Sequence, residues 1–280
     1  MRHKIRQAAN YIRQADAFLI TAGAGMGIDS GLPDFRGEQG FWRAFPPLKK
    51  LNLNFQHIAT PDLFHQNPHL AWGFYGLRLN SYRTTQPHRG YDILKKWADQ
   101  VHYGAYVFTS NVDDHFQAAG FAEQHVITCH GTIHQLQCLD VCHDQTWSAD
   151  CFQPEVDENT CLLTNDLPHC PECGSLARPN ILMFQDDGWL TPHQHSVKKA
   201  TFQYTWLPKP QNLVVIELGA GKDIPTVRNF SNHIATQKSA PLIRINPDEP
   251  QVSQQHHIGL KMGALHALQA IEKHLNDCPN

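Results

Sequence analysis

The sequence predicts an α/β protein with a doubly wound parallel sheet and a small cysteine-rich insertion. Four short apolar runs alternate along the chain with segments whose apolar residues recur at helical spacing. A glycine-rich turn follows two of these runs directly, as in sheets whose strands end beside a ligand. Six of the eight cysteines lie within residues 132–177, a stretch with little periodicity.

Each predicted strand is short, rich in β-branched or aromatic residues, and followed by polar residues or glycine. The strands are residues 17–21, 105–109, 213–217 and 242–246. Residues 2–15 predict an amphipathic first helix, because Ile5, Ala8 and Ile12 share one face. Residues 263–275 predict the last helix, with Leu268 and Leu275 on its apolar face. This alternation favours a Rossmann-like fold.

Two segments interrupt the alternation of strands and helices. Residues 38–88 are rich in aromatic and helix-compatible residues and predict a helical insertion. Residues 132–177 can bury little apolar surface, so they need another source of stability, such as a bound metal. We therefore expect residues 1–131 and 178–280 to form the Rossmann-like domain, and residues 132–177 to form a small module.

Composition and charge restrict the class of protein. Of the residues, 41% are hydrophobic and 18% are charged, which is typical of a folded protein rather than a disordered one. The net charge is -3 without a basic stripe, so nucleic acid is not expected as a partner. The polar start and the lack of an apolar run of ~20 residues predict neither a signal peptide nor a membrane span. We expect a cytoplasmic protein, whose cysteines serve as metal ligands or free thiols rather than disulfides.

The first glycine turn, Gly23-Ala24-Gly25, follows the strand of residues 17–21. A strand, a glycine turn and a helix N-terminus together form an anion site, because backbone N–H groups point outward there. The dehydrogenase pattern G-x-G-x-x-G would need a third glycine where Ile28 stands. The second turn, Gly219-Ala220-Gly221, also follows a strand. Two such turns predict a dinucleotide lying across the edge of the sheet, but not a hydride-transfer enzyme.

The cysteines form two pairs, Cys138-x3-Cys142 and Cys170-x2-Cys173, separated by 27 residues. Paired thiolates at this spacing suit a closed, tetrahedral structural zinc site. The second pair is the stronger signal. Cys151, Cys161 or His143 could take the place of Cys142.

Several strings in this chain resemble the sirtuin family, in the family's order. Residues 23–36 resemble its signature G-A-G-x-S-x-x-x-G-I-P-D-F-R, and "TSNVDDHFQAAG" at 109–120 resembles T-Q-N-I-D-x-L-x-x-x-A-G. "CHG" at 129–131, "CPECGSLARPNILMF" at 170–184, "GAG" at 219–221 and "RIN" at 244–246 follow at the family's positions. Sirtuins remove acyl groups from protein lysines and consume NAD, releasing nicotinamide and O-acyl-ADP-ribose.

The resemblance implies a role for each matching residue. His130 would be the catalytic base, Asn111 and Asp113 would meet the ribose and the nicotinamide carboxamide, and Phe35 would shield the reacting ribose face. Arg36 would pair with phosphate. The full set of implied NAD-binding residues is Gly23, Ala24, Gly25, Asp34, Phe35, Arg36, Ser110, Asn111, Val112, Asp113, Gly219, Ala220, Gly221 and Asn246.

The spacing Tyr75-x-x-Arg78 resembles the sirtuin class that removes succinyl and malonyl groups. A guanidinium and a phenol three residues apart share one helix face and could hold a distal carboxylate. The implied partner is an acyl-lysine protein or peptide; the oligomeric state stays open.

The chain also departs from the family pattern. Gly27 replaces a serine, Ser110 a glutamine, and Gly219-Ala220-Gly221 the sequence Gly-Thr-Ser. Phe184-Gln185-Asp186 stands where Phe-Gly-Glu is usual. Because the matching strings outnumber these departures, an NAD-dependent deacylase is the first hypothesis. An ADP-ribosyltransferase or NAD glycohydrolase on the same fold is the second, and a non-catalytic NAD sensor the third.

Overall fold

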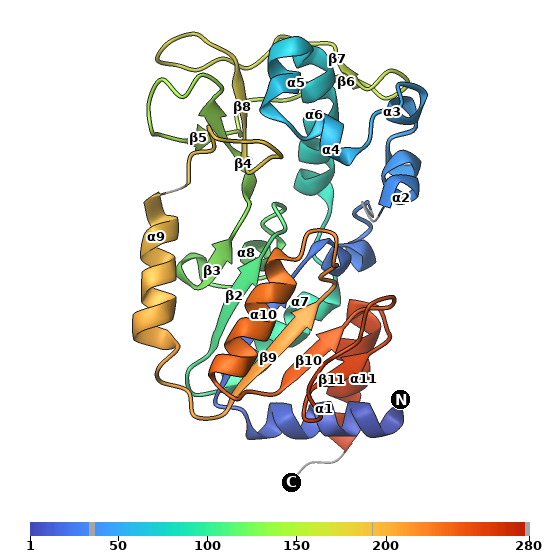
Figure 1. The fold of residues 1–280 in the computed structure, drawn as a ribbon, viewed down its shortest axis with the longest axis vertical. Coiled ribbons are helices and arrows are strands. Elements are labelled where there is room, and N and C mark those ends of the chain that lie inside the picture. Colours follow the sequence, from blue (N-terminus) through green and yellow to red (C-terminus); the bar gives the residue numbers. More distant parts are fainter. Residues whose placement is uncertain (34–36, 192, 278–280) are drawn as a thin grey trace.

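The computed structural model describes residues 1–33, 37–191 and 193–277, and it confirms the predicted α/β architecture (Figure 1). The main sheet is parallel, in the order β11-β10-β9-β1-β2-β3. Numbered along the chain, this is the strand order 3-2-1-4-5-6 of Rossmann folds. Its strands are β1 (Ala17–Ala22), β2 (Ala105–Thr109), β3 (Val126–Thr128), β9 (Leu213–Leu218), β10 (Leu242–Ile245) and β11 (Ile258–Leu260).

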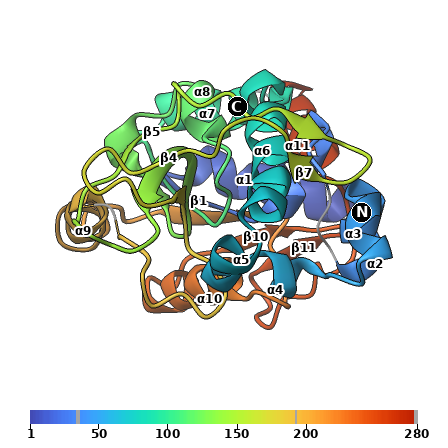
Figure 2. The same cartoon turned by 90° about the horizontal axis from the view of Figure 1, so that it is seen from above.

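Helices cover both faces of this sheet (Figure 2). Phe18 and Ile20 of β1 face one core, and Ala17 and Leu19 face the other. Because both faces are buried, the strands appear in the sequence as continuous apolar runs. The first face carries α1 (Arg2–Gln14), α7 (Arg89–Gln100) and α11 (Ala264–Asp277). The second carries α10 (Thr226–Gln237) and the short π-helix η4 (Thr201–Trp206), which follows α9 (His193–Ala200).

The four predicted strands and both predicted terminal helices are confirmed, with bounds that differ by a few residues. Strands β3 and β11 were not predicted. Each has three residues and lies at an edge of the sheet. Three residues are too few to show a periodic pattern, and pairing with β2 or β10 is what orders them.

The remaining elements, apart from the parallel sheet and its covering helices, lie beyond the carboxyl ends of the parallel strands (Figure 1). The helical insertion contains α2 (Gly37–Ala44), α3 (Pro46–Lys50), α4 (Phe55–Ile58), α5 (Pro61–Gln66) and α6 (Pro68–Thr84). The antiparallel sheet beside it contains β5 (Trp147–Ser148), β4 (Gly131–Cys138) and β8 (Ala177–Ile181), and a small hairpin pairs β6 (Val156–Asp157) with β7 (Leu162–Leu163). A short helix, α8 (His115–Ala118), follows β2.

The helical insertion and the cysteine-bearing segment share one hydrophobic core, which includes Phe74, Ile133 and Ile181. Gly73 shows how closely they pack, because a Cβ atom there would lie 1.9 Å from the carbonyl oxygen of Cys161. Among the described residues, no helix is both long and apolar enough to cross a membrane.

Candidate active site

The two glycine turns meet where the direction of strand succession reverses, between β1 and β9. Ala22 pairs with Leu218 at the ends of these strands. Gly23 donates its N–H to Leu218 at 3.0 Å, and Gly25 donates to Gly219 at 3.1 Å. This is the switch point at which doubly wound sheets bind ligands.

Glycine is required in these turns because their backbones touch. A Cβ atom on Gly23 would lie 2.9 Å from the Cα of Ala220, and one on Gly219 would lie 2.4 Å from the carbonyl carbon of Gly25. Gly219 also has a φ of +61°. The sequence predicted that these glycines let a diphosphate approach the backbone. In the structure, they let the two turns approach each other.

The chain after Gly23 differs from the expected helix N-terminus. It forms two three-residue 3₁₀ turns, η1 (Ala24–Met26) and η2 (Ile28–Ser30). The second ends at Gly31, which is left-handed with a φ of +90°. The N–H groups of Gly25, Met26 and Gly27 already donate to the carbonyls of Gly219, Gly23 and Ala24. Such short turns also have no long helix dipole.

The segment after β2 is held against the first turn by a chain of hydrogen bonds. Thr109 Oγ1 donates to the carbonyl of Ala22 at 3.0 Å and accepts from the N–H of Asn111 at 3.0 Å. Asp113 Oδ1 accepts from the N–H of His115 at 3.0 Å, so the carboxylate caps the start of α8 while it lines the cavity. The side-chain nitrogen of Asn111 is buried without a partner in the described part of the chain. It is therefore available to a ligand.

His130 lies between β3 and β4. Its carbonyl accepts the N–H of Leu182 at 3.0 Å, which ties the histidine to the strand after β8. Gly131 must be glycine, since its φ is +82° and a Cβ atom would lie 2.0 Å from the carbonyl oxygen of Asn180. Burial lowers the pKa of His130, so its imidazole is neutral and able to accept a proton near neutral pH.

Asp114 is a further ionisable group beside this site, although it does not line the cavity described below. Its Oδ2 accepts a hydrogen bond from Thr132 Oγ1 at 2.8 Å, so it links the Asp113 turn to the strand that follows His130. Burial raises the pKa of Asp114 to about 7.

One cavity of about 440 Å³ joins these groups. Of the predicted residues, Gly23, Ala24, Ser110, Asn111, Val112, Asp113, His130, Gly219, Ala220, Gly221, Tyr75 and Arg78 line it. Other residues on its wall were not assigned as site residues from the sequence: Leu32, Pro33, Phe55, Ala59, Tyr82, Ile181, Leu182, Met183, Phe184, Asp223, Ile224, Thr226 and Val227. Among these, Tyr82 could have been found, because it lies one helical turn after Arg78.

Some predicted residues stand elsewhere. Asp34, Phe35 and Arg36 lie outside the described residues. Gly25 belongs to the first turn but is buried, and it does not line the cavity. Asn246 supports the second turn, donating to the carbonyl of Ala220 at 2.9 Å. Direct contact of Gly25 or Asn246 with a cofactor stays a prediction.

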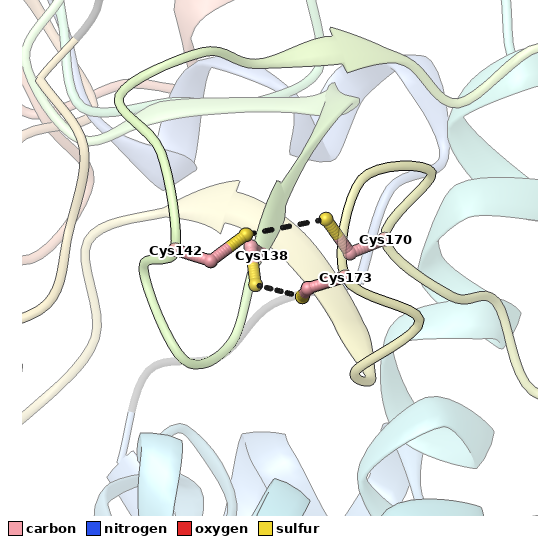
Figure 3. A group of neighbouring side chains, drawn as sticks. All are labelled: Cys138, Cys142, Cys170 and Cys173. Atoms are coloured by element: carbon pink, nitrogen blue, oxygen red, sulfur yellow. Dashed lines mark hydrogen bonds between the residues drawn. The ribbon is translucent and has the colours of Figure 1, made fainter.

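The four predicted zinc ligands gather into one cluster (Figure 3). All four sulfurs lie within 4.8 Å of one another, and the Cys138–Cys173 and Cys142–Cys170 distances are both 3.7 Å. A tetrahedral site with Zn–S bonds of about 2.3 Å separates its sulfurs by roughly 3.8 Å, so the cluster fits zinc. Cys142 is the fourth member; of the alternatives, His143 lies next to the cluster with Nε2 3.3 Å from Cys170 Sγ.

The altered Phe184-Gln185-Asp186 stretch keeps a defined backbone. Gln185 is left-handed, with a φ of +54°, at the position where glycine is usual. Phe184 donates its N–H to the carbonyl of Ala59 at 2.9 Å, which closes the cavity wall between the end of α4 and the segment after β8.

Comparison with known proteins is consistent with this geometry. The Sir2 family model matches residues 23–203. A protein of Pyrococcus abyssi named NAD-dependent protein deacylase is 32% identical over 180 residues, 64% of this chain and 65% of that protein. The match thus spans just under two thirds of that relative, while an Aquifex aeolicus protein of the same name is 28% identical over 91% of this chain and 93% of its own length. A solved Sir2 enzyme has the same fold, with a TM-score of 0.70 at 24% identity and 99% coverage of both chains. This chain belongs to the Sir2 family.

Proposed function

We propose that this protein is an NAD-dependent protein-lysine deacylase that prefers short acyl groups ending in a carboxylate. The observation that carries the proposal is the single cavity of about 440 Å³. It brings the two glycine turns, the Asn111–Asp113 segment and His130 together with Tyr75 and Arg78. The names of the relatives from Pyrococcus abyssi and Aquifex aeolicus support the same reaction class.

The glycine-turn end of the cavity suits a dinucleotide. Gly23 and Gly219 leave bare backbone where β1 and β9 end, and the unpartnered amide nitrogen of Asn111 lies in the same cavity. When bound, NAD supplies a carbon–nitrogen bond whose nicotinamide is a good leaving group. Asn111 would donate to the carboxamide or ribose, and Asp113 would accept from them.

His130 would act as the general base. Its neutral imidazole, favoured by burial, would take a proton from a ribose hydroxyl at a ring nitrogen. At the other end of the cavity, Arg78 would pair with the distal carboxylate of the acyl group and Tyr75 would donate its hydroxyl hydrogen. The zinc site would only stabilise the fold, since four thiolates leave no open coordination position.

The test is product analysis. The protein would be incubated with NAD and matched acetyl-, malonyl- and succinyl-lysine peptides, with His130→Ala as the control. We expect one O-acyl-ADP-ribose per nicotinamide, fastest with the dicarboxylic acyl groups, and loss of product in the variant. ADP-ribosylated protein would instead support the transferase. Nicotinamide release without an acyl peptide would support the glycohydrolase, and NAD binding without cleavage would support the sensor.

A further inference from the structure

Tyr82 lies beside Arg78 but outside the Tyr75-x-x-Arg78 pair. Both residues are on α6, four positions apart, and both are buried. Arg78 donates from Nε and from Nη2 to the Tyr82 hydroxyl oxygen, at 3.2 and 3.1 Å. One edge of the guanidinium is therefore fixed by a residue of its own helix.

Three aromatic rings from α6 surround the Arg78 guanidinium. Its central carbon lies 5.3 Å from the ring centre of Phe74, 5.5 Å from that of Tyr75 and 5.4 Å from that of Tyr82. Burying a cation is costly, and cation–π contacts together with charge-assisted hydrogen bonds offset that cost. The cation is thus held in one orientation before any ligand arrives.

The chemistry of the two phenols suits an anionic ligand. The Tyr82 oxygen uses its lone pairs to accept from Arg78, so its own O–H remains a donor. Burial raises the pKa of Tyr82, and it raises the pKa of Tyr75 to about 12, so both phenols keep their protons near neutral pH. The acyl end of the cavity therefore presents a cation and two O–H donors.

Arg78 and Tyr82 also form a wall. Together with Pro33 they line both the active-site cavity and a second cavity of about 430 Å³. The second cavity is also lined by Lys50 and Ser81, which are absent from the lining of the first. The Arg78–Tyr82 pair thus stands where the acyl end of the first cavity stops.

We propose that Tyr82 is a specificity-determining residue for the acyl group. It positions the Arg78 guanidinium for a distal carboxylate, and with Arg78 it closes the pocket, which limits the length of the chain. This inference rests on the proposed deacylase function.

The first test is Tyr82→Phe, which removes only the hydroxyl. A hydrogen bond to a charged group contributes enough that its loss gives roughly a tenfold change in affinity. We expect KM for a succinyl-lysine peptide to rise about tenfold, with kcat and the acetyl-lysine reaction unchanged. The matched control is Ser81→Ala, which should behave as the wild type. A succinyl KM within about twofold of the wild-type value would overturn the positioning role.

Two further variants keep the inference testable if Tyr82→Phe does not fold. Arg78→Lys retains a cation but cannot make the two-pronged bond to Tyr82, and it should give the same selective rise in KM. Tyr82→Ala should join the two cavities, raising kcat/KM for a suberoyl-lysine peptide relative to a succinyl-lysine peptide by about tenfold. If the ratio of the two kcat/KM values did not change, Tyr82 would not limit the length of the acyl chain. If the wild-type protein turned over no acyl-lysine peptide, the proposed function would fail as well, whereas turnover insensitive to Tyr82 would overturn this inference alone.

Discussion

Arg178 and Asp186 form a two-pronged ion pair that is almost completely buried. Arg178 Nη1 lies 2.8 Å from Asp186 Oδ2, and Nη2 lies 2.9 Å from Oδ1, with side-chain exposures of 1% and 0%. The same Oδ2 accepts the N–H of Met183 at 3.1 Å. The pair therefore holds in place the segment after β8, whose Met183 lines the cavity.

Removing one partner of this pair should destabilise the protein strongly. Asp186→Ala leaves the Arg178 cation buried without its counterion, which costs about 3–5 kcal/mol. The free energy of unfolding, measured by urea denaturation, should fall by that amount. The control is Asp99→Ala, because the Lys95–Asp99 pair is exposed and contributes about 0.5 kcal/mol. Equal losses in the two variants would contradict the importance of burial.

Mutation of the cysteines should separate the zinc ligands from the other thiols. We expect one zinc per chain, and less zinc in Cys142→Ser, because Cys142 is one of the four thiols of the cluster in the described part of the chain. Since metal binding supplies folding free energy, the variant should also melt at a lower temperature. Cys151→Ser should keep its zinc. Elemental analysis and thermal melting would check both, and full zinc occupancy in Cys142→Ser would refute the assignment.

The fall of kcat/KM at low pH should follow the protonation of the His130 imidazole. Burial lowers its pKa, so the neutral base persists below pH ~6.5, and kcat/KM should fall only at lower pH as the imidazole becomes protonated. The control is Asp114→Asn, because burial raises the pKa of that carboxyl to about 7. If the acidic limb moved in Asp114→Asn, the assignment of the proton transfer to His130 would be wrong. The measurement is kcat/KM between about pH 5 and pH 8.

Two left-handed glycines should differ in their tolerance of a methyl group. Gly219→Ala places alanine at a strained positive φ and also puts its Cβ atom within 2.4 Å of Gly25. Gly31→Ala has the backbone strain alone, because no atom lies within 4 Å of the added Cβ. We expect a loss of about 1–2 kcal/mol for Gly31→Ala and at least twice that for Gly219→Ala. Denaturation curves would show it. NAD binding, followed by calorimetry, should fall only in Gly219→Ala, and equal behaviour of the two would argue against contact between the turns.

The sequence by itself determined the features that depend on local pattern. Continuous apolar runs predicted β1, β2, β9 and β10, because central parallel strands are buried on both faces. The Gly-Ala-Gly turns and the His130-Gly131 pair were also visible in the sequence, and close backbone approach explains the glycine at Gly23, Gly219 and Gly131.

Only the tertiary structure decided the features that depend on residues far apart in the chain. Strand β11 exists because β10 pairs with it, and Cys142 rather than Cys151 joins the cluster because of how the segment folds back on Cys170. The bond from the Asn246 side chain to the carbonyl of Ala220 also joins residues far apart in the chain, and contact of Asn246 with a cofactor stays a prediction. The place of Tyr82 between two cavities depends on chain segments that pack against α6, and their arrangement leaves no trace in the spacing of residues along that helix.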